Sequence, residues 1–174
     1  LKAVNTIAVR DGVLYGANTD AYGFLESLRE AQPSWRADTG PVVVLGAGGA
    51  ARAIVAGLQD EGAPDILIAN RTAARSQALQ DEFGDPVRSI VWDERSEALD
   101  GAALIVNTTS LGMEGQPPLN LALDALPPGA VVYDIVYVPL ETPLLAAART
   151  RGNPAVDGLG MLLHQARPGF RDWF

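Results

Sequence analysis

The chain has 174 residues, which is enough for one domain with a substantial hydrophobic core. Hydrophobic residues make up 48% and charged residues 20%, an ordinary balance for a globular protein, and the net charge is −8. A surface this acidic repels phosphate backbones, and no apolar run reaches the ~20 residues needed to span a bilayer. We therefore expect no nucleic-acid partner, no membrane partner and a cytoplasmic location.

The residues that usually bind metals are scarce. The sequence has no cysteine and one histidine, His164, which excludes disulfides, a thiol nucleophile and a multi-histidine cluster. We expect no metal site. The chain opens at Leu1 without an initiator methionine, so we also expect a piece of a longer or processed protein.

The first 32 residues predict a hairpin followed by a helix. Strand-like residues 7–10 and 13–15 flank an Asp11-Gly12 turn. Capping residues come next, at Asn18-Thr19-Asp20, and apolar residues follow them at helical spacing until Gln32-Pro33. The stretch up to Gly40-Pro41 is typical of a linker.

From residue 42 onward, strand patterns alternate with helix patterns. Strands are expected at 42–45, 66–69, 87–92, 103–106, 130–133 and 154–156, and helices at 50–59, 73–83, 143–149 and from about 159 onward. This alternation predicts an α/β fold, a Rossmann-like doubly wound parallel sheet of about six strands flanked by helices, with an N-terminal arm and helix. A ligand crevice is expected at the carboxyl ends of the strands, where the strand order reverses.

A glycine-rich loop directly follows the first strand of this region. The sequence Gly46-Ala47-Gly48-Gly49-Ala50-Ala51 fits the pattern G-x-G-x-x-A and opens a helix, which is the context of a dinucleotide site. Gly46 permits a tight turn, Gly48 lets the backbone approach a pyrophosphate, and Ala51 allows close packing of helix on sheet. The free N–H groups at the helix start suit the phosphates.

The end of the next strand distinguishes NAD from NADP. An NAD site usually has an acidic residue there, whereas this strand ends in Asn70-Arg71-Thr72, with Arg75 one turn later. Asp65 precedes the strand and belongs to the opposite end of the sheet. Guanidinium groups and a hydroxyl suit a 2′-phosphate, so the sequence predicts NADP.

Further polar clusters, together with these, resemble the shikimate dehydrogenase family over almost the whole chain. The matching blocks are Ala3-Val4-Asn5-Thr6, Asn18-Thr19-Asp20 with Gly23-Phe24, Gly46 to Ala51, Asn70-Arg71-Thr72, Asn107-Thr108-Thr109-Ser110, Tyr137 with Pro139 and Thr142-Pro143, and Asp157 to Gln165. Alone, each block has a simpler interpretation: Asp20 as a helix N-cap, Asn107-Thr108-Thr109 as a turn, Gln165 as a surface residue.

The resemblance implies NADP-linked interconversion of 3-dehydroshikimate and shikimate, with Asp20 as a catalytic residue. It implies that Asn5, Thr19, Asp20, Tyr137 and Gln165 bind substrate. It implies that the cofactor is bound by Gly46, Ala47, Gly48, Gly49, Ala50, Asn70, Arg71, Thr72, Arg75, Thr109, Ser110, Ile135, Gly158 and Met161. Hydride transfer to a carbonyl develops alkoxide charge that a cation or proton donor must meet, and in the family a lysine acts beside the aspartate.

The resemblance also implies a domain organisation and a departure from the family. Residues 1–32 are expected to be the edge of a substrate domain with an inter-domain helix, residues 41–158 the NADP-binding Rossmann domain, and residues 159–174 a C-terminal inter-domain helix. The family's catalytic lysine and carboxylate-binding residues lie upstream of Ala3, and Lys2 is not that lysine. We expect the chain alone to bind cofactor but to turn over poorly, and the 18–29 helix to expose an apolar face that favours a homodimer.

Three alternatives stay open at this point. The first is a quinate/shikimate dehydrogenase, since the two substrates differ only by ring saturation and one hydroxyl. The second is another NADP enzyme with a similar sheet, such as a methylene-tetrahydrofolate dehydrogenase relative. The third is a non-catalytic dinucleotide-binding module.

Overall fold

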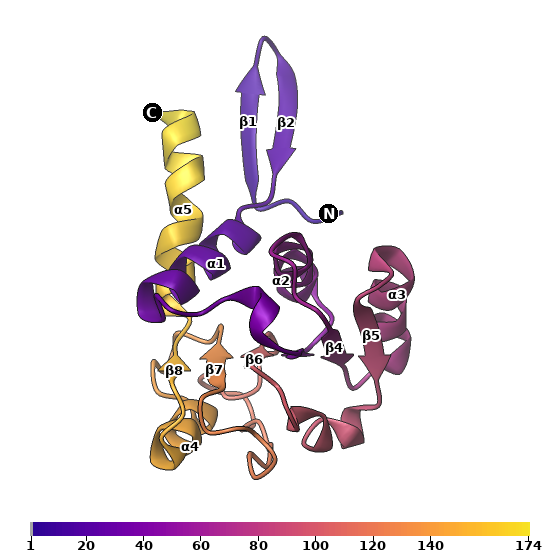
Figure 1. Ribbon diagram of the computed structural model, residues 1–174. Helices are drawn as coiled ribbons and strands as arrows, with labels where there is room; N and C mark the ends of the chain where they lie inside the picture. Colours follow the sequence, from indigo (N-terminus) through magenta and orange to yellow (C-terminus); the bar gives the residue numbers. More distant parts are fainter. Residues whose placement is uncertain (1) are drawn as a thin grey trace.

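The computed structural model describes residues 2–174 and contains two sheets (Figure 1). The larger is a six-stranded parallel sheet with strand order β5-β4-β3-β6-β7-β8, and the smaller is the antiparallel hairpin β1-β2. The strands are β1 Thr6–Arg10, β2 Val13–Ala17, β3 Val42–Leu45, β4 Ile66–Ala69, β5 Val87–Ile90, β6 Leu104–Asn107, β7 Val131–Asp134 and β8 Ala155–Val156. The helices are α1 Asp20–Ala31, α2 Gly49–Asp60, α3 Ala73–Phe83, α4 Pro143–Arg151 and α5 Leu159–Trp173, with 3-10 turns η1 Ala37–Thr39, η2 Trp92–Glu94 and η3 Glu97–Leu99.

The predicted fold class and element order are confirmed, and the boundaries differ by one or two residues in most places. One predicted strand is shorter than expected: β5 ends at Ile90 instead of continuing to residue 92, because Trp92 begins η2. The predicted linker before residue 40 contains η1. The strand order reverses between β3 and β6, as the doubly wound prediction requires.

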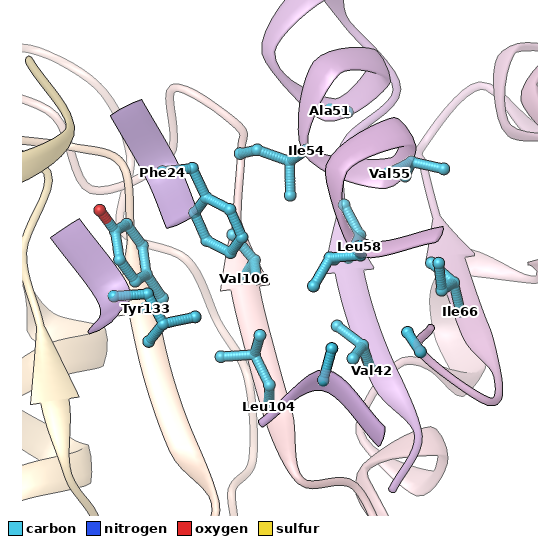
Figure 2. Close-up of a cluster of buried hydrophobic side chains, with 14 of the residues drawn as sticks. Phe24, Val42, Ala51, Ile54, Val55, Leu58, Ile66, Leu104, Val106 and Tyr133 are labelled. Carbon is cyan, nitrogen blue, oxygen red and sulfur yellow. The ribbon is translucent and has the colours of Figure 1, made fainter. Parts of the chain in front are cut away.

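The sheet is covered on both faces, which explains why its central strands are continuous apolar runs. All four residues of β3 are buried, and alternate side chains point to opposite faces. Val42 and Val44 pack in a cluster with residues of α1, α2 and α5 (Figure 2). Val43 and Leu45 pack in the second cluster, which contains residues of α4 and of the segment 119–126.

The apolar face of α1 is covered, so the expectation that it lies exposed is wrong. Phe24 and Leu28 are fully buried, and the Phe24 ring meets the edge of Tyr133 with 4.9 Å between centroids (Figure 2). The Tyr133 hydroxyl donates to Ser27 Oγ at 2.9 Å, and burial raises the pKa of this tyrosine strongly. The helix therefore buries its own stripe against β7, α2 and α5.

Exposed apolar side chains gather instead on the hairpin and on α5, which both extend away from the sheet (Figure 1). They include Ile7, Val9 and Leu14 on the hairpin and Leu163, Phe170 and Phe174 at the end of the chain. The two elements are joined to each other, because Trp173 Nε1 donates to the carbonyl of Ile7 at 3.2 Å. Across the residues from 2 to 174, no helix has the length and apolar character that crossing a membrane requires.

The crossing of α1 and α5 depends on two glycines. A Cβ added to Gly23 would lie 2.7 Å from Gln165 Cβ and 2.8 Å from the carbonyl oxygen of Met161. A Cβ on Gly160 would lie 2.3 Å from Ser27 Oγ. Without side chains at these positions the helix backbones approach closely, and this approach places the first turn of α1 beside residues 161–165.

Gly23→Ala should therefore destabilise the protein by about 1–3 kcal/mol, since the added methyl must push two helix backbones apart. Gly129→Ala is the matched control, because a Cβ there meets nothing within 4 Å. Urea unfolding followed by circular dichroism measures both variants. Equal stability of the two variants would show that the helices do not need this approach.

Candidate functional site

The site is assembled by the register of the parallel sheet. Leu45 at the end of β3 pairs with Ala69 of β4 on one side and Asn107 of β6 on the other, and Asn107 pairs with Asp134 of β7. The carboxyl ends of β3, β4, β6 and β7 therefore lie at the same edge of the sheet. The segments that follow these strands, which are predicted to contact cofactor or substrate, all start from that edge. The glycine loop 46–51 and the segments 70–75, 107–110 and 134–137 meet there although they lie far apart in sequence.

Gly46 is required by the fold itself. Its φ is +108°, in the region that favours glycine, and an added Cβ would lie 2.5 Å from Thr108 Oγ1. That hydroxyl is fixed because it donates to the carbonyl of Leu45 at 2.6 Å. The tight turn expected at Gly46 is confirmed, and the contact across from β6 adds a second reason for it.

The next two glycines stand in a different environment. A Cβ on Gly48 or Gly49 would meet nothing within 4 Å, both residues are exposed, and no side chain caps the start of α2. Ala51 is fully buried in the core, which confirms its predicted role in close packing. The chain's own packing thus explains Gly46 and Ala51 and leaves the space beside Gly48 and Gly49 open to an approaching ligand.

Arg71 and Arg75 follow β4 as exposed cations. Neither guanidinium forms an ion pair with a carboxylate of residues 2–174, although most of the chain's arginines do. Asp65 lies before β4 and pairs with Arg88, as expected for the opposite end of the sheet. The Asn70 amide donates to the carbonyl of Thr72 at 2.9 Å and shapes the turn that carries the arginines.

Asp20 is held by two amide side chains. Asn5 Nδ2 donates to Asp20 Oδ1 at 2.6 Å, and Asn18 Nδ2 approaches Oδ2 at 3.5 Å. The N-cap of α1 is Thr19, without a side-chain capping bond, so the simple interpretation of Asp20 as an N-cap is wrong. Thr19 instead donates its N–H and its hydroxyl to Asn5 Oδ1, at 3.0 and 3.2 Å. The carboxylate is thereby oriented while remaining partly exposed.

Two adjoining cavities collect all five predicted substrate residues. The first, of about 180 Å³, is lined by Asp20, Tyr137 and Gln165 together with Ala50, Ile135, Gly158, Met161 and Leu162. The second, of about 210 Å³, is lined by Asn5, Thr19 and again Gln165 and Leu162, among others. Asp20 thus opens on the same cavity as the first turn of α2. The other predicted cofactor residues lie along the strand ends outside these cavities.

Gly158 has a structural explanation that the sequence did not suggest. An added Cβ would lie 2.0 Å from the carbonyl oxygen of Ile135, and the Gly158 N–H donates to the carbonyl of Val136 at 3.1 Å. The start of α5 therefore presses backbone against backbone on the loop after β7. This contact brings Met161 and Ile135 into the cavity that contains Asp20.

A buried polar network beneath the strand ends was not assigned as a site from the sequence. Asn107 and Asp134 are fully buried, and Asn107 Nδ2 donates to Asp134 Oδ1 at 2.9 Å. Thr142 Oγ1 donates to Asp134 Oδ2 at 2.7 Å. Burial raises the pKa of the Asp134 carboxyl, which has no cation among these partners. The signal available in the sequence was a polar residue at the end of each of two neighbouring apolar strands.

Within 2–174, no group of three or more acidic or histidine side chains is arranged to hold a metal ion.

The sheet topology, the glycine turn and the free arginines define a class: a Rossmann-like dinucleotide-binding domain. Residues 29–113 match the family model described as shikimate / quinate 5-dehydrogenase. The chain is 61% identical over 173 residues to the shikimate dehydrogenase (NADP(+)) of Paramagnetospirillum magneticum, covering 99% of this chain and 63% of that protein. It is 58% identical to the enzyme of the same name from Rhodospirillum rubrum, again over 99% of this chain and 62% of the relative.

Solved structures of lower identity show the same arrangement. Shikimate 5-dehydrogenase from Thermus thermophilus in complex with NADP(H) and shikimate has a TM-score of 0.84 at 38% identity, covering 98% of this chain and 62% of that one. Quinate dehydrogenase from Corynebacterium glutamicum in complex with NAD has a TM-score of 0.89 at 32% identity, with the same coverage. The chain is similar to these shikimate and quinate dehydrogenases over almost its whole length, and it spans under two thirds of the length of the relatives.

Gly46→Ala should destabilise the fold by about 2 kcal/mol or more, because it combines a positive φ with a clash against Thr108. Gly49→Ala should leave stability unchanged or slightly raised, because its Cβ meets no atom and alanine favours a helix. Thermal unfolding of the two variants tests the contrast. If the Gly46→Ala protein were as stable as the Gly49→Ala protein, this explanation of the turn would be contradicted.

Proposed function

We propose that this chain forms the dinucleotide-binding part of an NADP-dependent shikimate dehydrogenase, an oxidoreductase that interconverts 3-dehydroshikimate and shikimate. The observation that carries the proposal is the cavity in which Asp20 faces Ala50, Ile135 and Met161. A carboxylate held by amides thus opens on the start of the helix that follows the glycine loop. The names of the two relatives reported above support the same activity.

The residues present fit an NADP cofactor. The open space beside Gly48 and Gly49, with the uncapped start of α2, suits a pyrophosphate, which is anionic and needs close backbone approach. Arg71 and Arg75 suit the additional 2′-phosphate through charge-assisted hydrogen bonds. Gly46, Ala47, Asn70, Thr72, Thr109 and Ser110 complete the proposed cofactor contacts at the strand ends, with Ile135, Gly158 and Met161 on the nicotinamide side. When bound, NADPH supplies the hydride.

Asp20 acts at the substrate hydroxyl that becomes the carbonyl. The Asn5 and Asn18 amides hold its carboxylate in one orientation, so that it can accept a hydrogen bond or a proton from that hydroxyl. Thr19, Tyr137 and Gln165 offer neutral donors and acceptors suited to a polyol ring. Because Gln165 lines both cavities, the substrate site extends from Asp20 toward Asn5.

Residues 2–174 place no cationic partner beside Asp20. Lys2 pairs with Glu82 at 3.4 Å instead. We therefore keep the expectation that this chain alone binds cofactor and turns over poorly, with the family's lysine acting beside Asp20. The proposed domains remain residues 1–32 as substrate-domain edge, 41–158 as NADP-binding domain and 159–174 as inter-domain helix. A cytoplasmic location and a homodimer stay predictions.

Quinate is a second candidate substrate, favoured by the family description and by the fold match to quinate dehydrogenase. Shikimate and quinate would use the same Asp20 and the same cofactor edge. Steady-state kinetics with both substrates, on a protein of the relatives' full length, separates the two. A protein that binds NADPH and oxidises neither substrate would support the non-catalytic module instead.

Arg71→Ala should remove most of the preference for NADPH over NADH, because NADH lacks the 2′-phosphate that this guanidinium would bind. We expect the ratio of the two dissociation constants to fall about tenfold or more, with NADH binding nearly unchanged. Titration of the 174-residue chain, followed by NADPH and NADH fluorescence, measures both constants.

Arg36→Ala is the matched control, because Arg36 is an exposed arginine that precedes β3, pairs with Asp38 and stands outside the proposed site. It should leave both constants unchanged. If the Arg71→Ala chain keeps the wild-type ratio, the NADP assignment fails.

A further inference from the structure

Asp134 stands between the two loops that the proposed function assigns to ligand binding. One loop, residues 107–111, follows β6 and lies against the Gly46 turn, since Thr109 Cγ2 would be 3.2 Å from a Cβ at Gly46. The other, residues 135–142, follows β7 and contributes Ile135 and Tyr137 to the cavity with Asp20. We propose that Asp134 is a positioning residue that holds these two loops in the arrangement that binds the dinucleotide.

The first loop is fixed through Asn107. Asn107 gives one amide N–H to Asp134 and also donates to the carbonyl of Leu111 at 3.1 Å. Its oxygen accepts the Thr109 N–H at 3.1 Å and the Thr109 hydroxyl at 2.7 Å. Both the nitrogen and the oxygen of the Asn107 amide are thus hydrogen-bonded, and the orientation of the amide depends on the hydrogen bond that Asp134 accepts from it. A turned amide would present the wrong group to Thr109.

The second loop is fixed by Asp134 directly. The carboxylate accepts from the Val136 N–H at 3.1 Å and from the Thr142 hydroxyl at 2.7 Å. Thr142 in turn accepts from the Leu145 N–H at 3.3 Å and caps α4. One side chain therefore holds both the start and the end of the segment that carries Tyr137.

The Asp134 carboxylate satisfies these partners because both of its oxygens accept. Asn107, Val136 and Thr142 all donate to Asp134, and the carboxylate is fully buried. An amide in its place would turn a donor toward one of them and leave a buried group unsatisfied. The two loops would then lose the hydrogen bonds that connect them through residue 134, while the backbone of each loop stayed intact.

This inference rests on the proposed function, because it needs a chain that binds a dinucleotide. The test variant is Asp134→Asn, measured at a temperature well below its midpoint of thermal unfolding. We expect this variant to weaken the binding of NADPH and of NADH by the same factor, roughly tenfold, because residues that position the ligand-binding groups typically contribute that much to affinity. The ratio of the two constants, which Arg71 controls, should stay at its wild-type value.

Asn153→Ala is the control for a purely structural role. Asn153 is buried at the opposite end of β7, where its amide donates to the carbonyls of Pro127 and Ala130 at 2.8 and 3.0 Å. This variant should lower the unfolding midpoint and leave both dissociation constants within twofold of wild type. A stability loss without a binding loss at Asp134, or equal binding losses at both positions, overturns the proposal.

A second pair of variants decides the matter if Asp134→Asn does not fold. Thr142→Val removes the hydroxyl that donates to Asp134 and keeps the shape, whereas Thr142→Ser keeps the hydroxyl. We expect the valine variant to bind both cofactors more weakly and the serine variant to bind them as the wild type does. Equal cofactor affinities of the two variants would overturn the proposal. A wild-type chain that binds no NADPH would contradict the proposed function itself, which is a distinguishable outcome.

Discussion

The register of four parallel strands is the constraint on which the rest of the structure depends. Ala69, Leu45, Asn107 and Asp134 stand side by side in one row of the sheet. Residues immediately after this row are brought together from segments as distant as 46 and 135. A slip of one residue in any of these strands would turn buried side chains to the opposite face and separate the loops.

Helices α1 and α5 connect the strand ends to the hairpin. The close crossing of α1 and α5 at Gly23 sets Asp20 opposite Met161 and Gln165. The end of α5 then reaches β1, where Trp173 bonds to the backbone of Ile7 and Arg10 pairs with Asp172 at 3.6 Å. Asn5, which orients Asp20, precedes that strand. The proposed substrate side is therefore tied to the nucleotide side by packing as well as by chain connectivity.

Much of the fold could be predicted from sequence because its signals are local. The apolar run 42–45, the glycine loop and the strand-helix spacing each fix an element without reference to distant residues. The extent of β5 could not, since Trp92 also fits a strand pattern and its 3-10 turn depends on packing against the second cluster. The covered face of α1 was missed for the same reason: the sequence shows an apolar stripe but not what packs on it.

The candidate site was predictable in part. Arg71 and the glycine loop are found from spacing, and Asp20 and Gln165 from a family resemblance. The roles of Asn18 and Asp134 depend on contacts made across the fold, and periodicity carries no information about them. Likewise, the sequence predicts the turn at Gly46, but the contacts that an added Cβ would make with Thr108 at Gly46 and with Ile135 at Gly158 are visible only in the structure.

That separation among the glycines has an evolutionary consequence. Substitution at 46 or 158 is opposed by atoms of the chain itself, so selection for a folded protein is enough to preserve glycine there. Substitution at 48 or 49 meets no such opposition. A descendant that folded but had ceased to bind a dinucleotide would drift first at 48 and 49, and those two codons are where a loss of the ligand would leave its earliest trace.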